Sequence, residues 1–125
     1  MGIAMQYGSG TLKKDQMLAQ PIMHTSGNWT WWEFASGLII GTTTVNVSYT
    51  PSTTQGNMYR TASAVSLGVT PFSFSSGEIS VMASQVQWAV NPNVDVAAQE
   101  LKCYFMSATS AARTPTVHVI FIGRQ

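Results

Sequence analysis

Charged side chains are scarce in this sequence, and their scarcity excludes several classes of function. Only 9% of the 125 residues are charged and the formal net charge is +1, so the chain has no basic surface for a nucleic acid. No apolar run is longer than that of residues 119–122, far below the roughly 20 residues of a membrane-spanning helix. A single cysteine, Cys103, excludes an intramolecular disulfide. We therefore expect no nucleic-acid partner, no membrane insertion and a fold that depends on core packing.

Helical periodicity is also nearly absent. The stretch LKKDQMLAQ at residues 12–20 allows a short helix or stem segment, which Pro21 ends. From Trp29 onward, β-branched and aromatic residues form short runs separated by Gly, Pro, Ser and Asn clusters, which predicts an all-β, antiparallel sandwich of jelly-roll-like type. We divide the chain into an N-terminal stem or linker, residues 1–28, and a sandwich domain, residues 29–125. The expected strands span residues 29–34, 37–49, 57–69, 78–83, 86–90, 95–107 and 116–123.

Alternation within these strands predicts which side chains share a face. Val45, Val47 and Tyr49 point to one side of their strand while the polar residues between them point to the other, as in a sheet with one solvated face. In ISVMASQVQWAV the apolar positions change parity, from Ile79, Val81 and Ala83 to Val86, Trp88 and Val90. This change predicts a bulge or turn near residues 84–85.

Three stretches, WTWWEF, LKCYFM and VHVIFI, are apolar on both faces. A strand of a two-layer sandwich has only one covered face, so a second cover is needed, and another copy of the chain is the simplest one. The alternative cover is a loop or the N-terminal segment. We expect a homotrimer whose subunit interface includes Trp29, Trp31, His118, Ile120 and Ile122.

Two of these stretches carry a resemblance to a known family. TSGNWTWWEFASGLII is similar to the opening strand of C-terminal domains of tail-fibre and minor structural proteins of tailed bacteriophages, and VHVIFIGRQ resembles their closing strand. The resemblance covers the two ends of the β region. It implies a small β-sandwich that assembles as a trimer at the distal tip of a fibre and contacts the host surface.

The sequence offers little for catalysis. Glu33 is the one carboxylate in an aromatic setting, and we expect it at a strand end, exposed or paired with an arginine. Asp95 follows NPN and fits a turn-capping role. Cys103 shares a strand face with apolar residues and fits a core position, and His118 lies in the middle of a strand. We expect no enzyme activity, no metal site and no cofactor.

Binding remains as a function. Saccharides are recognised by aromatic faces together with neutral amides and hydroxyls, and the expected loops carry such residues. TPSTTQGNMY is the longest polar connection and is our first choice for the site. The candidate ligand-binding residues are Gln55, Asn57, Tyr59, Asn91, Asn93 and Arg113.

The sequence thus predicts the tip domain of a phage or prophage tail fibre, made in the bacterial cytoplasm and carried on the virion, which binds a host cell-surface polysaccharide or protein receptor. Two alternatives stay open. One is a carbohydrate-binding accessory module of a bacterial enzyme, which would usually be a monomer. The other is a purely structural virion domain, such as a capsid decoration domain, without a ligand pocket.

Overall fold

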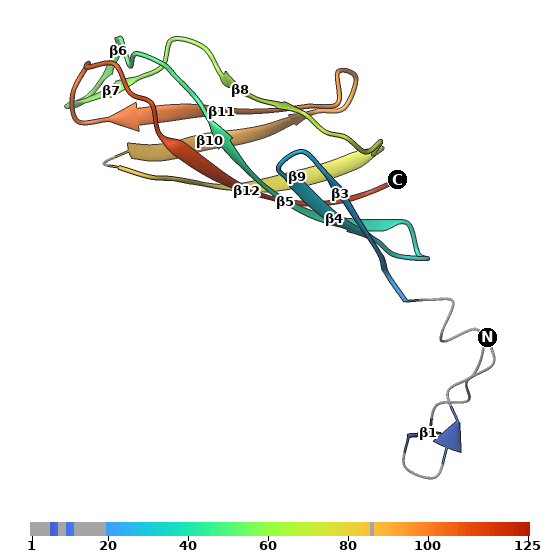
Figure 1. Cartoon of the computed structure of the whole chain (residues 1–125). Helices are drawn as coiled ribbons and strands as arrows, with labels where there is room; N and C mark the ends of the chain where they lie inside the picture. The colour runs from blue at the N-terminus through green and yellow to red at the C-terminus, as the bar shows by residue number, and fades with distance from the viewer. Residues whose placement is uncertain (1–5, 8–9, 12–19, 86) are drawn as a thin grey trace.

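The computed structural model describes residues 6–7, 10–11, 20–85 and 87–125, and these residues contain strands and turns but no helix. Two short strands, β1 (Gln6–Tyr7) and β2 (Gly10–Thr11), pair with each other. The remaining strands form two antiparallel sheets that stack as a sandwich, which confirms the predicted fold class (Figure 1). Most of the segment 12–20, where a short helix was allowed, lies outside the described residues.

Five strands make up sheet I, in the order β3-β4-β5-β12-β9. Their bounds are β3 (Ile22–Ser26), β4 (Trp29–Glu33), β5 (Leu38–Asn46), β9 (Ser76–Ala83) and β12 (Thr116–Arg124). β3 was not expected from the sequence. It pairs with β4 along its whole length, so the sheet begins inside the segment 1–28 that the sequence set apart as a stem or linker.

Sheet II has the order β10-β11-β7-β6, and β8 also pairs with β11 beside β7. Its strands are β6 (Thr53–Gln55), β7 (Met58–Arg60), β8 (Val65–Val69), β10 (Gln87–Asp95) and β11 (Glu100–Ser107). The β6–β7 hairpin and the β3–β4 hairpin lie at opposite ends of the sandwich (Figure 1). The polar stretch expected as a loop is therefore this hairpin, with its turn at residues 56–57.

The core lies between the two sheets. Every second residue of β11 and β12 is buried, and those between them are half-buried in β11 and mostly exposed in β12. Val117, Val119 and Phe121 are buried on one face. Phe72, from the segment between β8 and β9, contacts the rings of Trp29, Trp31 and Phe121 at centroid distances of 5.2, 5.4 and 5.1 Å. The core therefore joins sheet I to a loop as well as to the opposite sheet.

Two turn predictions had different outcomes. The chain breaks where the parity changes, because β9 ends at Ala83 and Gln85 has a positive φ of 67° before β10 begins. NPN, however, is not a turn. β10 continues through it with a bulge at residues 91–92, and the turn follows at residues 96–99, where Ala98 N donates a hydrogen bond to the Asp95 carboxylate (3.1 Å). Asp95 thus caps a turn, as predicted, but this turn is at residues 96–99 and not at NPN.

Candidate functional site

The outer face of sheet II carries an aromatic and polar surface that the core does not use. Alternation along β11 buries Leu101, Cys103 and Phe105 and turns Tyr104 and Met106 outward. Trp88 of β10 is the cross-strand partner of Met106 and is 49% exposed. Because directly paired residues of an antiparallel sheet share a face, Trp88 lies on the same surface as these two side chains.

A hollow of about 460 Å³ lies on this face, towards the end of the sandwich that holds β6 and β7. Four strands contribute to it, and both of the amides in its lining were sequence candidates. The lining residues are Gln55, Arg60, Val90, Asn91, Tyr104 and Met106. We call these six residues, with the adjoining Trp88, the sheet II platform.

Arg60 is the cation of this platform. Its guanidinium carbon lies 4.9 Å from the centroid of the Tyr104 ring, and its Nη1 donates a hydrogen bond to the Thr61 carbonyl (3.1 Å). Within the part of the chain that the structure describes, no carboxylate forms an ion pair with Arg60.

The neighbouring cation on the same face is neutralised, in contrast to Arg60. Lys102 Nζ lies 3.2 Å from a Glu100 carboxylate oxygen and 3.9 Å from one of Asp95. A hydrogen bond from the Ser66 hydroxyl (2.7 Å), together with Lys102, lowers the pKa of Glu100. Glu100 therefore remains ionised beside Lys102, and Arg60 is the charge that this face offers to an anion.

The six ligand-binding candidates do not form one site. Gln55 and Asn91 meet at the platform. Asn57 is exposed in the β6–β7 turn, and Tyr59 is paired with the buried Ser107, on the face of β7 opposite to Arg60.

The last two candidates lie elsewhere. Asn93 lines a separate hollow of about 410 Å³ together with Glu78 and Pro92. Arg113 forms an isolated bridge with Tyr49, and its Nη2 donates to the Thr109 hydroxyl (2.8 Å).

Sequence reasoning missed Arg60, Tyr104 and Trp88 as site residues. Trp88 was expected on the apolar face of its strand, but Gln87 is the buried residue and Trp88 faces outward. The signal for Tyr104 was present, because alternation from the buried Cys103 places it on the opposite face.

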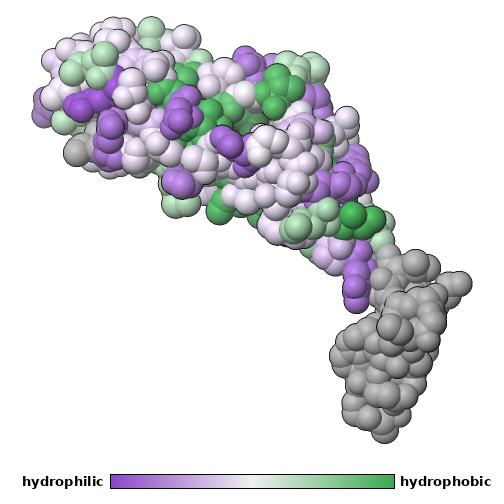
Figure 2. Space-filling view, in the orientation of Figure 1, coloured by the Kyte–Doolittle hydropathy of each residue, from purple (hydrophilic) through white to green (hydrophobic). Residues whose placement is uncertain are grey.

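The outer face of sheet I carries one apolar row among polar side chains, which include Thr42, Ser80 and, beside Ile122, Glu78. Cross-strand pairing aligns one side chain from each of four strands, in the sequence Met23 (β3), Trp32 (β4), Ile40 (β5) and Ile122 (β12). We call these four residues the apolar row. Ile122 is 52% exposed, and hydrophobic surface is also visible at the beginning of β3 (Figure 2).

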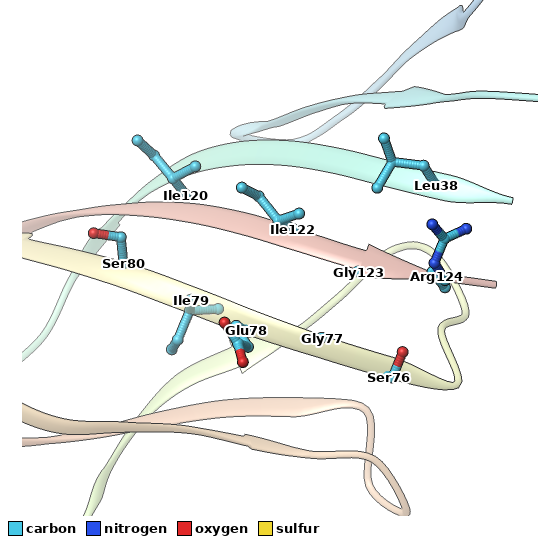
Figure 3. Close-up of a pocket in the computed structure, with 10 residues that line it drawn as sticks. All are labelled: Leu38, Ser76, Gly77, Glu78, Ile79, Ser80, Ile120, Ile122, Gly123 and Arg124. Atoms are coloured by element: carbon cyan, nitrogen blue, oxygen red, sulfur yellow. The ribbon is translucent and has the colours of Figure 1, made fainter. Parts of the chain in front are cut away.

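Beside the apolar row lies a hollow of about 580 Å³, to which β5, β9 and β12 contribute. Leu38, Ile120 and Ile122 point to the same side of the sheet there, whereas Ile79 points to the other (Figure 3). Ile120 is 39% exposed. Of these side chains, Ile120 and Ile122 are the exposed ones.

The predicted subunit interface needs a correction, because its residues lie on opposite faces of sheet I. Trp31 pairs with Gly41, which pairs with Phe121, so Trp31 belongs to the inner face and is only 7% exposed. Trp29 packs against the same core. His118, Ile120 and Ile122 lie on the outer face. The chain's own Phe72 covers the two tryptophans, so only the latter three residues are available to a second subunit.

Glu33, Cys103 and His118 each contact or pack against other parts of the fold. Glu33 lies at the end of β4, as expected, and accepts a hydrogen bond from the Trp31 indole (3.3 Å). It is partly exposed, and its other oxygen lies 3.5 Å from His24 Nε2 and not beside an arginine. Cys103 is fully buried, as predicted, and burial raises the pKa of its thiol to about 11. His118 lies with Nδ1 3.4 Å from the Thr44 hydroxyl. Among the described residues, no group of three or more His, Cys, Asp or Glu side chains is placed to hold a metal.

Comparison with known proteins gives one solved structure to which the chain is similar. No protein-family model matches the chain, and no curated protein matches it. A C-terminal fragment of the R1 pyocin fibre of P. aeruginosa superimposes with a TM-score of 0.49 at 17% sequence identity, over 88% of this chain and 30% of that one. Within the described residues, no helix is long and apolar enough to cross a membrane.

Proposed function

We propose that the chain is the tip domain of a phage or prophage tail fibre, which assembles as a homotrimer and binds a host cell-surface receptor, a glycan in the first instance. In this proposal the outer face of sheet I is the subunit interface, and the outer face of sheet II is presented to the receptor. The domain acts on the virion after synthesis in the bacterial cytoplasm. Its role is binding and not catalysis.

The apolar row is the observation that carries this proposal. Met23, Trp32, Ile40 and Ile122 adjoin one another across four strands. Among the described residues, Met23 and Ile122 are 61% and 52% exposed, whereas Trp32 and Ile40 are half-buried. Exposed apolar patches that extend over several strands are typical of subunit interfaces, where aromatic residues are enriched and charges are depleted. A cyclic trimer is built from head-to-tail contacts between two different patches of each subunit, and in this proposal the outer face of sheet I supplies both.

The placement of the two family-like stretches supports the proposal. Residues 29–40 include β4 and the start of β5, and residues 116–124 are β12. β5 pairs with β4 on one side and with β12 on the other, so both stretches form one continuous part of sheet I. The part of the chain that resembles fibre-tip domains is therefore the part that would form the trimer.

The exposed ring of Trp88 favours a second candidate function, a carbohydrate-binding accessory module. Such a module usually works as a monomer, so the molar mass in solution separates the two. A purely structural virion domain would share the trimer but bind no ligand at sheet II. Binding of the fluorescently labelled domain to a panel of bacterial cells, before and after their surface polysaccharide is stripped, tests the receptor role. A trimer that binds no cells of any strain would favour the structural domain.

A further inference from the structure

We propose that the sheet II platform binds a saccharide that carries a carboxylate, with Arg60 on the carboxylate and Trp88 against the sugar ring. This inference rests on the proposed function in taking a glycan as the receptor, but it does not depend on the trimer. It assigns the chemical class of the ligand, an acidic glycan, and the face that holds it.

Arg60 determines the charge of the ligand. One of its nitrogens donates to the Thr61 carbonyl and its guanidinium carbon lies over the Tyr104 ring, which leaves the other N–H groups of the guanidinium to a ligand. A planar guanidinium matches a carboxylate through two parallel hydrogen bonds, and holding it in place beforehand lowers the entropic cost of binding. Among the described residues, no acidic side chain lines the hollow, so the carboxylate of a ligand would meet the Arg60 counter-ion there.

Trp88 supplies the surface for the sugar ring. Its exposed side chain adjoins Met106, and the next cross-strand pair on the same face, Val90 and Tyr104, continues the surface. The C–H face of a pyranose is apolar and packs on such rings, while its hydroxyls need partners at the edge. Trp88 and Arg60 lie on either side of Met106 in one cross-strand row. A ring and a cation separated by one side chain on the same face fit a uronic or sialic acid unit better than a neutral sugar or a small anion.

Two amides complete the platform, and the backbone places one of them in an unusual way. Gln55 and Asn91 lie at the hollow from β6 and β10. Asn91 has a positive φ of 51°, at the bulge where the pairing of β10 with β11 shifts register. Bulges redirect side chains and are frequent beside binding sites, and a left-handed non-glycine residue is a strained position that the surrounding structure must support. We assign the two amides to the hydroxyls of the sugar.

The test measures binding of the purified domain to immobilised acidic saccharides: oligogalacturonate, a hyaluronan oligosaccharide and polysialic acid, each beside its carboxyl-reduced form. We expect at least one acidic probe to bind and its reduced form to bind about tenfold more weakly or worse, the range of a lost charge-assisted hydrogen bond. Binding to none of the acidic probes, or equal binding to the reduced forms, would overturn the assignment.

Variants then locate the site. Arg60→Gln should lose the preference for the acidic probe, whereas Arg60→Lys should recover part of it, because lysine keeps the charge but lacks the two parallel donors of the guanidinium. Trp88→Ala should weaken binding, and Trp88→Phe should retain most of it. Lys102→Gln is the matched control, because that cation on the same face is already paired, and it should bind as the wild type does. Equal losses in Lys102→Gln and Arg60→Gln would show a general charge effect and reject the site. Melting temperatures of all variants report whether the fold is intact.

These outcomes are separate from those of the proposed function. A monomer that binds an acidic glycan through Arg60 would refute the fibre-tip trimer and leave this site in place. A trimer that adsorbs to cells equally well with Arg60→Gln would refute this site alone.

Discussion

Gly123 is the position where one added methyl group should disturb the sandwich most. It lies in β12 directly opposite Gly77 of β9, and the Phe121 ring covers both glycines. A Cβ at residue 123 would meet the carbonyl oxygen of Ser76 and would lie 2.6 and 2.7 Å from two atoms of that ring. Close packing thus explains why a glycine is needed in the closing Ile-Gly-Arg stretch.

The size of the effect follows from this overlap. Carbon atoms pack at about 3.5–4.0 Å, so the ring or the strand must move by roughly 1 Å. Overpacking of this kind costs about 1–3 kcal/mol, and each kcal/mol lowers the melting temperature of a domain of this size by roughly 2–8 °C. We therefore expect Gly123→Ala to lower the melting temperature by about 2–24 °C in a thermal scan followed by circular dichroism.

A double variant distinguishes ring overlap from a general intolerance of the strand. In Gly123→Ala with Phe121→Leu, the shorter side chain leaves room for the methyl group, so the double variant should lose less stability than the sum of the two single changes. Strictly additive losses would place the clash at the backbone of Ser76. A Gly123→Ala protein that melts with the wild type would refute the packing of Phe121 over the glycine pair.

The other predictions concern assembly, ionisation and catalysis. Ile120→Glu should yield a folded but monomeric protein, because an unpaired charge cannot be buried at an interface. Val69→Glu, at an exposed apolar position on sheet II, should leave the molar mass unchanged. Size-exclusion chromatography with light scattering compares the two variants, and normal assembly of Ile120→Glu would show that the outer face of sheet I is solvated. Burial raises the pKa of the Cys103 thiol from 9.0 to about 11, so between these pH values the thiol ionises in the unfolded chain and stays protonated in the folded one. The free energy of unfolding should therefore fall as the pH rises from about 9. A Cys103→Ala variant with the same fall would exclude the thiol as its cause. Neither the wild type nor Glu33→Gln should hydrolyse bacterial cell-wall or capsular glycans, and turnover by the wild type that Glu33→Gln abolishes would contradict the binding role.

The parts of the fold that sequence could predict are those with strict alternation. Val117, Val119 and Phe121 share a face by period alone, and the structure buries all three. β3 escaped prediction because its five residues include three polar ones and its alternation buries neither face. Its pairing with β4 is visible only in three dimensions.

The NPN bulge shows how turn signals mislead at a sheet edge. Asn-Pro-Asn is a strong turn signal, but β10 is the edge strand of sheet II, where a proline costs no hydrogen bond of the ladder. Tertiary pairing therefore carries the strand past Pro92 and leaves Asn91 at the platform.

The residues of the candidate surfaces are brought together by the register of strand pairing, which cannot be read from the sequence. WTWWEF and VHVIFI are apolar on both faces, so period 2 separates the faces without showing which one is the core. The pairing of Trp31 with Gly41, and of Gly41 with Phe121, shows which face is the core. It places Trp31 on the inner face, although from the sequence this residue was expected at the subunit interface. Arg60 and Tyr104 are 44 positions apart and meet only because β7 pairs with β11.

The molar mass of the chain in solution tests the central claim most directly. If the apolar row of sheet I is the subunit interface of a fibre tip, light scattering at micromolar concentration should give three times the chain mass of 13.5 kDa. A mass of 13.5 kDa would contradict the trimer and with it the reading of sheet I as an interface.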